Sequence, residues 1–329
     1  MPYSAGAVIG IDIGGTKISI GIADMNSSML SRYERSTPQD PNEGVEWILA
    51  KIADWHKKQD NRFQRIYGIG IGCAGPLDKE AGMVLHSPNL PKWIDYPISE
   101  ALREEYDVPV FLENDANLAA LGEHRLGAGR GMENIVYITV STGIGGGIIA
   151  NGKLVTGVGG SAGEIGHMTI KEDGPDCNCG SKGCLETLAS GTAIVRMAAE
   201  WIKNSDKPSM MRKLVGIQGM LTAELVAKAA SNGDEAAEEI IHKAMGYLGI
   251  GVANVVTTLS PEAVVIGGGV AKIGETLFKK VNEVVRERVR LVPVEKVKII
   301  PASLAPDSGL YGAFHMVTKN KNNIAQSKE

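Results

Sequence analysis

The sequence lacks several features that would assign it to a specialised class. Only 5% of its 329 residues are aromatic, it has four cysteines, and 34 lysine and arginine residues nearly balance 38 aspartate and glutamate residues. Because there is no basic excess or basic block, we expect no nucleic-acid partner. The hydrophobic share of 43% is enough for a sizeable core, which excludes intrinsic disorder for most of the chain.

Long apolar runs are also missing. No segment reaches the ~18 consecutive apolar residues of a membrane span. The first apolar run, residues 7–13, is broken by Asp12, and it has neither a cationic segment before it nor a small-residue cleavage site. We therefore expect no signal peptide, no membrane partner and a cytoplasmic location.

Glycine, in contrast, is abundant, with 41 residues and no low-complexity repeat. Residues 8–23 follow the pattern strand, Gly/Thr turn, strand, and the same pattern returns at residues 135–150. Two copies of one unit predict two domains of like fold that face each other. Between and after these copies, short apolar strands alternate with helical patterns, which predicts an α/β fold. The helices are expected at residues ~43–57, 116–126, ~187–204, ~221–231, ~235–259 and ~272–290.

Three glycine-rich turns are candidate nucleotide contacts. The first comprises Asp12, Gly14, Gly15, Thr16 and Lys17 and lies between two strands, which argues against a Walker A loop or a dinucleotide fingerprint. It could cradle phosphates through its N–H groups or be a plain hairpin turn. Its echo includes Thr142, Gly143 and Gly145, and two such turns could grip a triphosphate from both sides. The third cluster, Gly267, Gly268 and Gly269, could lie against a nucleotide or cap a helix.

An acidic segment follows another predicted strand. Glu113, Asn114 and Asp115 stand at a strand end, where ligands bind in open α/β sheets. Phosphoryl transfer to an alcohol needs one carboxylate to accept the hydroxyl proton, and either Asp115 or Glu113 could do this. The alternative is that Asp115, or Asn114, only caps the helix that follows.

A histidine and three cysteines have the spacing of a metal site. Three of the four cysteines fall within eight positions, which suits a metal better than a disulfide framework in a reducing compartment. His167, Cys177, Cys179 and Cys184 supply the Cys₃His set of a tetrahedral zinc site without an open position, so we expect structural Zn²⁺. Buried thiols are the alternative.

Glutamates flank this cluster in sequence. Glu164 and Glu186 could accept hydrogen bonds from sugar hydroxyls, or they could be solvated carboxylates.

Together these residues resemble the ROK family (repressors, open reading frames and sugar kinases), which has the actin/hexokinase/Hsp70 fold. The resemblance covers nearly the whole chain. Its most specific part is Glu164-Ile-Gly-His167 followed by Cys-x-Cys-Gly-x-x-Gly-Cys-x-Glu at residues 177–186.

The resemblance implies two actin-like (ribonuclease H-like) domains around a central cleft, with a zinc-binding loop. We place the smaller domain at residues 1–117 plus 307–329 and the larger at 118–306. Such kinases often form homodimers or higher homo-oligomers. Family repressors carry an N-terminal helix-turn-helix, and with seven residues before the first strand we expect none here.

The resemblance also implies a reaction and its residues. Asp115 would be the catalytic base for the 6-hydroxyl of glucose, and ATP would lie across the cleft with Mg²⁺ near Asp12. Sugar contacts would come from residues matching Gly75, Asn89, Asn114, Asp115, Glu164, His167 and Glu186.

The sequence around Glu164 resembles the glucokinase branch, so we predict a glucokinase. Alternatives are an N-acetylmannosamine or N-acetylglucosamine kinase, a non-catalytic sugar sensor, and a zinc-stabilised interaction protein.

Overall fold

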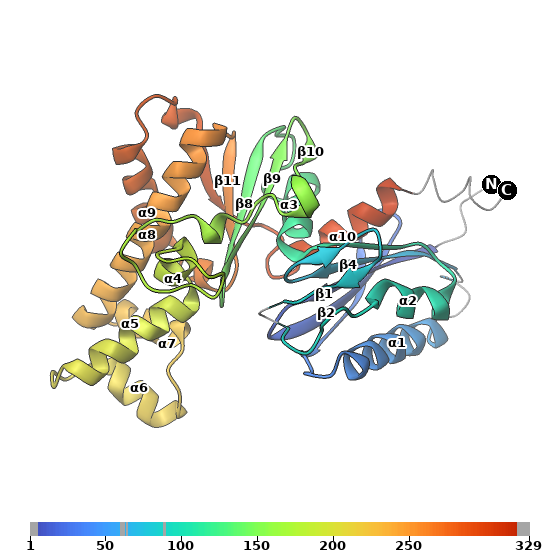
Figure 1. Ribbon diagram of the computed structural model, residues 1–329, viewed down its shortest axis with the longest axis horizontal. Helices are drawn as coiled ribbons and strands as arrows, with labels where there is room; N and C mark the ends of the chain where they lie inside the picture. The colour runs from blue at the N-terminus through green and yellow to red at the C-terminus, as the bar shows by residue number, and fades with distance from the viewer. Residues whose placement is uncertain (1–5, 60–62, 64, 88–89, 321–329) are drawn as a thin grey trace. The chain divides into compact units, whose positions relative to one another are not determined.

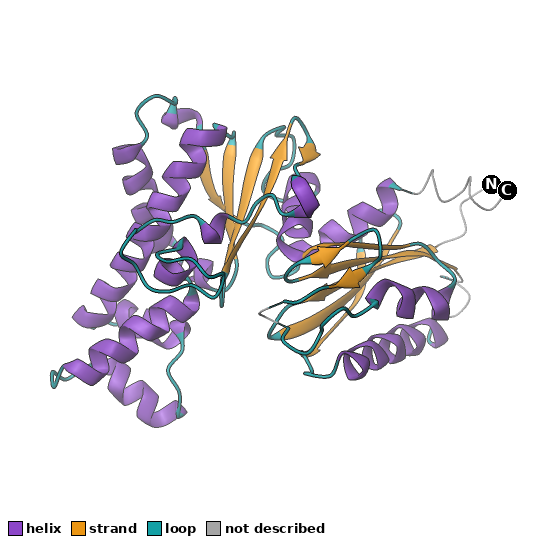
Figure 2. Ribbon diagram, in the orientation of Figure 1, coloured by secondary structure: helices purple, strands orange, loops and turns teal. Residues whose placement is uncertain are grey.

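The computed structural model describes residues 6–59, 63, 65–87 and 90–320 and confirms the α/β fold. It contains two five-stranded sheets with equivalent strand orders (Figures 1 and 2). The first has the order β3-β2-β1-β4-β7 and the second the order β10-β9-β8-β11-β12. In each, the first three strands along the chain are neighbours and the last two continue beyond the first, so the predicted internal repeat extends to whole sheets.

The first sheet is built from strands β1 (Gly6–Ile13), β2 (Lys17–Asp24), β3 (Met29–Ser36), β4 (Arg65–Cys73) and β7 (Val110–Asn114). β1, β2 and β3 are antiparallel neighbours, whereas β4 and β7 run parallel to β1. The short β5 (Leu77–Asp78) and β6 (Met83–Val84) form a separate pair.

One face of the first sheet carries isoleucines at alternate positions. Ile9, Ile11 and Ile13 are fully buried there in a core shared with helices α1 (Pro41–Lys57) and α2 (Ile98–Tyr106). Alternation along a strand sends the intervening residues to the other face.

The opposite face of this sheet carries glycines at the positions between the isoleucines. Gly10 pairs with Gly21 on β2 and with Gly70 on β4, so three glycines lie in a row across the sheet. Helix α10 (Ser308–Lys319) packs on this row so closely that a Cβ atom at Gly10 would lie 2.9 Å from the Phe314 ring. The Ile-Gly-Ile sequences at residues 9–11, 20–22 and 69–71 thus reflect one sheet face that packs side chains and one that packs against a helix.

Helix α3 (Asp115–Arg125) packs closely against α10 because each helix has a glycine at the contact. A Cβ atom at Gly122 would lie 2.2 Å from the carbonyl oxygen of Ser308, and one at Gly312 would lie 1.8 Å from that of Leu118. Ser308 Oγ also donates a 2.7 Å hydrogen bond to Oε1 of the fully buried Glu123. α10 therefore fixes the helix that begins at Asp115.

The second sheet consists of β8 (Ile135–Val140), β9 (Ile144–Ala150), β10 (Lys153–Leu154), β11 (Ala263–Gly267) and β12 (Lys298–Pro301). The helices that accompany it are α4 (Leu185–Ala189), α5 (Gly191–Asn204), α6 (Met210–Gln218), α7 (Ala223–Ser231), α8 (Glu235–Leu259) and α9 (Glu275–Arg288). Four 3₁₀ turns are η1 (Val158–Gly160), η2 (Ile165–His167), η3 (Val270–Ile273) and η4 (Val294–Lys296).

Among the described residues, α8 is the one helix long and apolar enough to cross a membrane, but 61% of its most apolar window is buried. It packs against α4, α5, α7 and α9, which is the environment of a core helix.

The chain divides into two compact units. Unit 1 comprises Met1–Gly131, Gly147–Ala162 and Pro306–Glu329, and unit 2 comprises Met132–Gly146 and Gly163–Ala305. The domain boundaries given above stay a prediction.

Candidate functional site

The first glycine turn closes the β1–β2 hairpin in unit 1. Gly14 N–H donates to the Lys17 carbonyl at 3.0 Å, and Gly15 and Thr16 are exposed at the tip. Thr37 Oγ1 donates to the Gly14 carbonyl at 2.6 Å, which fixes the turn from the neighbouring strand end. The turn is therefore rigid at its base and accessible at its tip.

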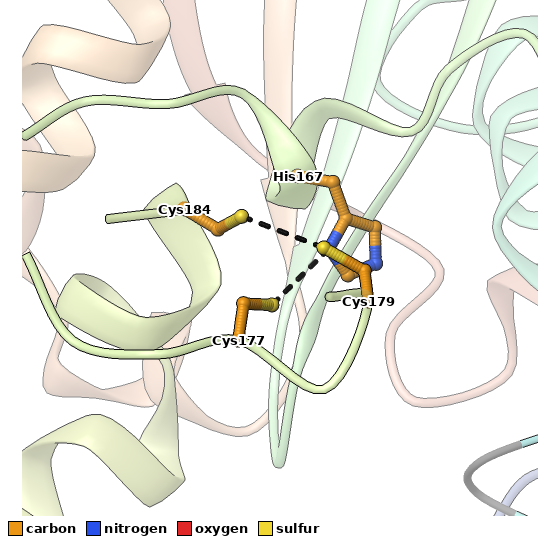
Figure 3. Close-up of side chains that lie close together, drawn as sticks. All are labelled: His167, Cys177, Cys179 and Cys184. Atoms are coloured by element: carbon orange, nitrogen blue, oxygen red, sulfur yellow. Dashed lines mark hydrogen bonds between the residues drawn. The ribbon is translucent and has the colours of Figure 1, made fainter. Parts of the chain in front are cut away.

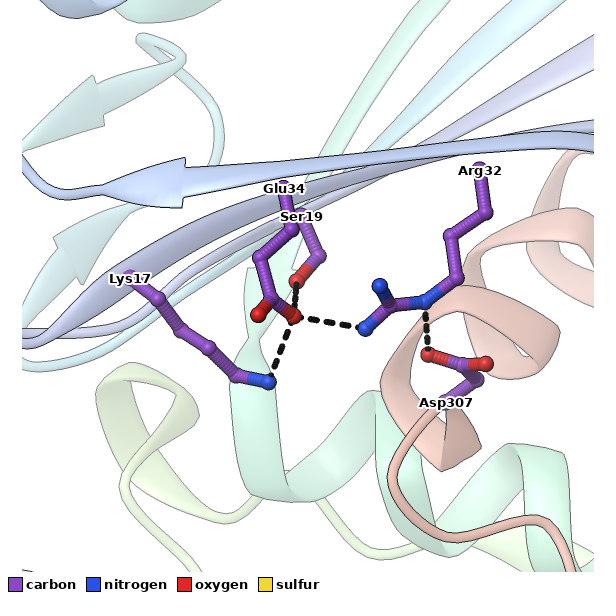
Figure 4. A network of polar contacts seen from close by, with 5 residues as sticks. All are labelled: Lys17, Ser19, Arg32, Glu34 and Asp307. Atoms are coloured by element: carbon purple, nitrogen blue, oxygen red, sulfur yellow. Dashed lines mark hydrogen bonds and ion pairs between the residues drawn. The ribbon is translucent and has the colours of Figure 1, made fainter.

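A network of charges extends from this turn along β2 and β3 (Figure 4). Glu34 Oε2 accepts hydrogen bonds from Lys17 Nζ at 2.7 Å, Arg32 Nη2 at 2.6 Å and Ser19 Oγ at 3.2 Å. Arg32 Nε donates in turn to Asp307 Oδ1 at 2.7 Å, next to the start of α10. The donors lower the pKa of Glu34 to about 2, with the Lys17 bond the largest contribution.

Asp12, at the end of β1, carries an unusual pKa. Its pKa is raised from 3.8 to about 7, mainly by burial and then by the negative charge of Asp115, while Lys17 partly opposes the shift. A carboxylate that ionises near neutrality gains most from a cation beside it. This would suit Asp12 to a position near Mg²⁺, which the family resemblance implies and which stays a prediction.

The acidic segment Glu113-Asn114-Asp115 joins β7 to α3. Asn114 is the helix N-cap, since its Oδ1 accepts hydrogen bonds from the N–H groups of Ala116 at 2.9 Å and Asn117 at 3.1 Å. Asp115 is then the first residue of α3. Asn114 is therefore the N-cap, although Asp115 Oδ1 also accepts a hydrogen bond from the Ala116 N–H at 2.8 Å, and the role of Asp115 as base stays a prediction.

Two further predicted sugar contacts belong to the same unit. Gly75 has φ +104°, and a Cβ atom on it would lie 2.3 Å from Ser87 Oγ, so only glycine fits there. Asn89 lies outside the described residues.

His167, Cys177, Cys179 and Cys184 converge in unit 2 (Figure 3), with one ligand atom from each within 4.8 Å of the others. The sequence Cys-x-Cys-Gly-x-x-Gly-Cys brings them together through a tight turn. Gly180 and Gly183 have φ values of +90° and +63°, and a Cβ atom at Gly183 would lie 1.5 Å from the carbonyl oxygen of Lys171.

The distances in this cluster fit a tetrahedral zinc ion. Cys177 Sγ lies 3.6 Å from His167 Nδ1, and Cys179 Sγ lies 3.7 Å from Cys184 Sγ. Zinc bonds of about 2.3 Å to sulfur and 2.0–2.1 Å to nitrogen place tetrahedral ligand atoms about 3.5–3.8 Å apart. A hydrogen bond from the Ser181 N–H also lowers the pKa of Cys179 to about 7, which favours the thiolate that a metal needs.

The two ring nitrogens of His167 face different groups. Nδ1 is directed at the thiols, while Nε2 lies 3.9 Å from Oε2 of Glu164. The cluster therefore leaves Nε2 beside a predicted sugar carboxylate.

The second glycine turn, residues 141–143, joins β8 to β9 and is also held from outside. Gly191 N–H donates to the Ser141 carbonyl at 2.7 Å, and Thr192 Oγ1 donates to the Thr142 carbonyl at 2.8 Å. The Ile144 N–H donates to Glu186 Oε2 at 2.8 Å. Gly145, by contrast, is a residue of strand β9 rather than of the turn.

The third glycine cluster follows β11. Gly268 has φ +87°, and a Cβ atom there would lie 2.3 Å from the Val140 carbonyl oxygen. Gly269 is the N-cap of η3, so the cluster is a capping turn, with Gly267 closing the strand. This describes the backbone of the cluster, and its contact with a nucleotide stays a prediction.

Comparison with known proteins identifies the family. Residues 8–320 match the ROK family, and the chain belongs to it. A glucokinase of Halalkalibacterium halodurans is 37% identical over 326 residues, which cover 98% of each chain. The ROK family glucokinase from Streptomyces griseus, crystallised with glucose and AMPPNP, has a TM-score of 0.82 at 34% identity and covers 94% of this chain and 99% of its own.

A regulator of the same family is also similar. A xylose repressor of Caldicellulosiruptor bescii is 33% identical over 286 residues, which cover 85% of this chain and 70% of the repressor.

Sequence reasoning missed three participants in the site. Lys79, Arg32 and Asp307 contact predicted site residues or their neighbours through ion pairs. Their partners lie 34 and 275 positions away along the chain, so no local spacing could have revealed them.

Proposed function

We propose that the protein is an ATP-dependent glucokinase that transfers the γ-phosphoryl group of ATP to the 6-hydroxyl of glucose. The observation that carries this is the glucokinase similarity along nearly the full chain, together with the position of Asp115 where strand β7 ends and helix α3 begins. Acting as general base, Asp115 would accept the hydroxyl proton as the oxygen attacks the γ-phosphorus. Both glycine turns would contact the phosphates through backbone N–H groups, and Gly267–Gly269 would contact adenosine.

Two metals complete this proposal. Mg²⁺ would neutralise phosphate charge beside Asp12, whose pKa is raised mainly by burial and then by the negative charge of Asp115. Zn²⁺ would be held by His167, Cys177, Cys179 and Cys184 and would fix the loop that carries Glu164 and Glu186. Because all four ligands come from the protein, the zinc would stabilise structure rather than activate water.

Sugar recognition would use the side chains that the family resemblance implies. Asn114 Oδ1 is occupied by the helix cap, so its Nδ2 amide is the group left to donate to a hydroxyl. Glu164, Glu186 and Nε2 of His167 would supply the remaining polar contacts, with Gly75 and Asn89 beside them. N-acetylmannosamine and N-acetylglucosamine are the alternative substrates. We further propose that the protein is cytoplasmic and forms a homodimer or higher homo-oligomer.

A sugar panel under MgATP tests the reaction. We expect kcat/KM to be highest for glucose and sugar-free ATP hydrolysis to be negligible. A second candidate, a non-catalytic sugar sensor, is favoured by the repressor similarity. Sugar binding without any phosphoryl transfer across the panel would support the sensor and contradict the kinase.

A further inference from the structure

Glu186 makes a contact that its expected sugar role does not explain. Its Oε2 accepts a 2.8 Å hydrogen bond from the N–H of Ile144, the residue directly after the second glycine turn. Glu186 lies two residues beyond the cluster cysteine Cys184, in the first turn of α4. One side chain thus ties the loop of the His/Cys₃ cluster to the turn expected to bind phosphate.

The space beside Glu186 is available only because residue 143 is glycine. A Cβ atom at Gly143 would lie 2.2 Å from Glu186 Oε2, and the three atoms nearest to it all belong to Glu186. φ at Gly143 is not positive, so the backbone there would accept alanine. The glycine at 143 therefore makes room for this carboxylate rather than for an unusual backbone conformation.

The other residues that hold the turn bind its carbonyl groups, whereas Glu186 binds the N–H group that follows it. Gly191 and Thr192 hold the carbonyl groups of Ser141 and Thr142, but they accept nothing from the N–H groups. The bond from the Ile144 N–H to Glu186 sets the direction of the peptide that follows Gly143. A carboxylate repels a phosphate because both are negatively charged, so a direct contact between Glu186 and the phosphates would not be favourable. A role through the Ile144 N–H needs no such contact.

We propose that Glu186 is a positioning residue for nucleotide binding: its carboxylate orients the 141–143 turn through the Ile144 N–H. This inference rests on the proposed kinase function and adds a role on the phosphate side to a residue otherwise expected only on the sugar side. It makes the affinity for nucleotide dependent on Glu186 even when no sugar is present.

The experiment measures the affinity for a non-hydrolysable ATP analogue with Mg²⁺, by calorimetry without sugar. Glu186→Ala should bind about tenfold more weakly or worse, as expected for a lost hydrogen bond to a charged group. Glu186→Gln keeps a carbonyl oxygen that can accept from Ile144 N–H and should stay within about twofold of the wild type. Glu172→Ala, which removes an exposed carboxylate of the same loop, is the matched control and should leave the affinity unchanged.

A double-mutant cycle makes the test specific. Gly143→Ala should weaken nucleotide binding because the new methyl group displaces the carboxylate, and Gly143→Ala with Glu186→Ala should be no weaker than Glu186→Ala alone. Additive losses, or a Glu186→Ala variant that binds the analogue as well as the wild type or more tightly, would overturn the inference. Failure of the wild type to bind the analogue would overturn the kinase function as well, so the two failures are distinguishable.

Discussion

The Nζ atom of Lys79 lies 3.1 Å from Oε1 and 3.0 Å from Oε2 of Glu113, so one ammonium group holds both oxygens of a carboxylate that is only 7% exposed. Oε1 of Glu113 also accepts from the Asn114 N–H and from Asn117 Nδ2. Such a carboxylate anchors the strand end rather than accepting a substrate proton. Of the two acids that the sequence leaves open as base, the geometry favours Asp115.

We therefore predict different outcomes for the two acids. Asp115→Asn should keep glucose binding and lower kcat by at least ~10²-fold, because the amide can accept a hydrogen bond but cannot take the proton. Glu113→Gln should mainly reduce stability, since it leaves Lys79 half-buried beside a neutral group. Steady-state kinetics with urea unfolding separates the two effects, and normal turnover by folded Asp115→Asn would remove it from the base role.

The His/Cys₃ cluster predicts one zinc ion per chain. Cys179→Ser should lose the metal and destabilise the loop that carries Glu164 and Glu186, because a hydroxyl replaces a thiolate ligand. Metal analysis of the purified protein, with thermal unfolding before and after chelation, checks this. Full activity in a metal-free preparation would contradict a structural zinc.

His167 should have a second role through its other ring nitrogen. Nδ1 faces the thiols and Nε2 is left on the side of Glu164, so His167→Cys could keep a four-thiolate site while losing the Nε2 contact. We expect retained zinc and glucose binding weaker by ~1–3 kcal/mol.

Cys184→Ser is the comparison for His167→Cys, and it should lose metal and glucose binding together. Zinc content and glucose Kd are measured for both. A His167→Cys variant that keeps zinc and binds glucose like the wild type would restrict His167 to metal binding.

The raised pKa of Asp12 predicts that the free energy of unfolding of the metal-free protein depends on pH. Its pKa rises from 3.8 to about 7 on folding, so the native state holds an extra proton between these values. The stability that this proton provides is complete below pH 3.8 and is lost as the pH rises through about 7. Asp12→Asn removes the titration. Between pH 5 and pH 8 the free energy of unfolding of the variant should therefore rise relative to that of the wild type by about 1–3 kcal/mol, at 1.36 kcal/mol per pKa unit.

Urea unfolding at the two pH values, without Mg²⁺ or nucleotide, measures this difference. If the variant and the wild type differ by the same amount at both, the titration of Asp12 is not coupled to folding. The same variant should lose kinase activity, since the carboxylate proposed to face Mg²⁺ is gone.

Much of the architecture was readable from local patterns. The short apolar runs and the helical spacing around Ile48 and Ile52 depend on neighbours in sequence, and the structure confirms the strands and the helix that they predict. The Cys-x-Cys-Gly signature is also local, and the structure brings its side chains together with His167. Strand β3 was missed because it is an edge strand of alternating polar residues, and helices α2 and α6, of nine residues each, were missed because they are short.

The site was less readable than the fold. The N-cap could be Asn114 or Asp115 on sequence alone, because both types cap helices and only the backbone direction decides. The bonds of Glu34 to Lys17 and of Glu186 to Ile144 join residues 17 and 42 positions apart. Local spacing carries no record of such pairs, and they decide which groups remain available to a ligand.

The α3–α10 contact sets an order on biosynthesis. Oε1 of Glu123 accepts a hydrogen bond from a serine made 185 residues later, and the glycine-to-backbone packing of Gly122 and Gly312 cannot form before then. During translation, the helix that begins at Asp115 must wait while the whole of unit 2 emerges from the ribosome. Earlier in synthesis α3 can pack only against partners such as β4 and β7, so its complete packing, and with it activity, should arise only once residues 308–319 are free to fold.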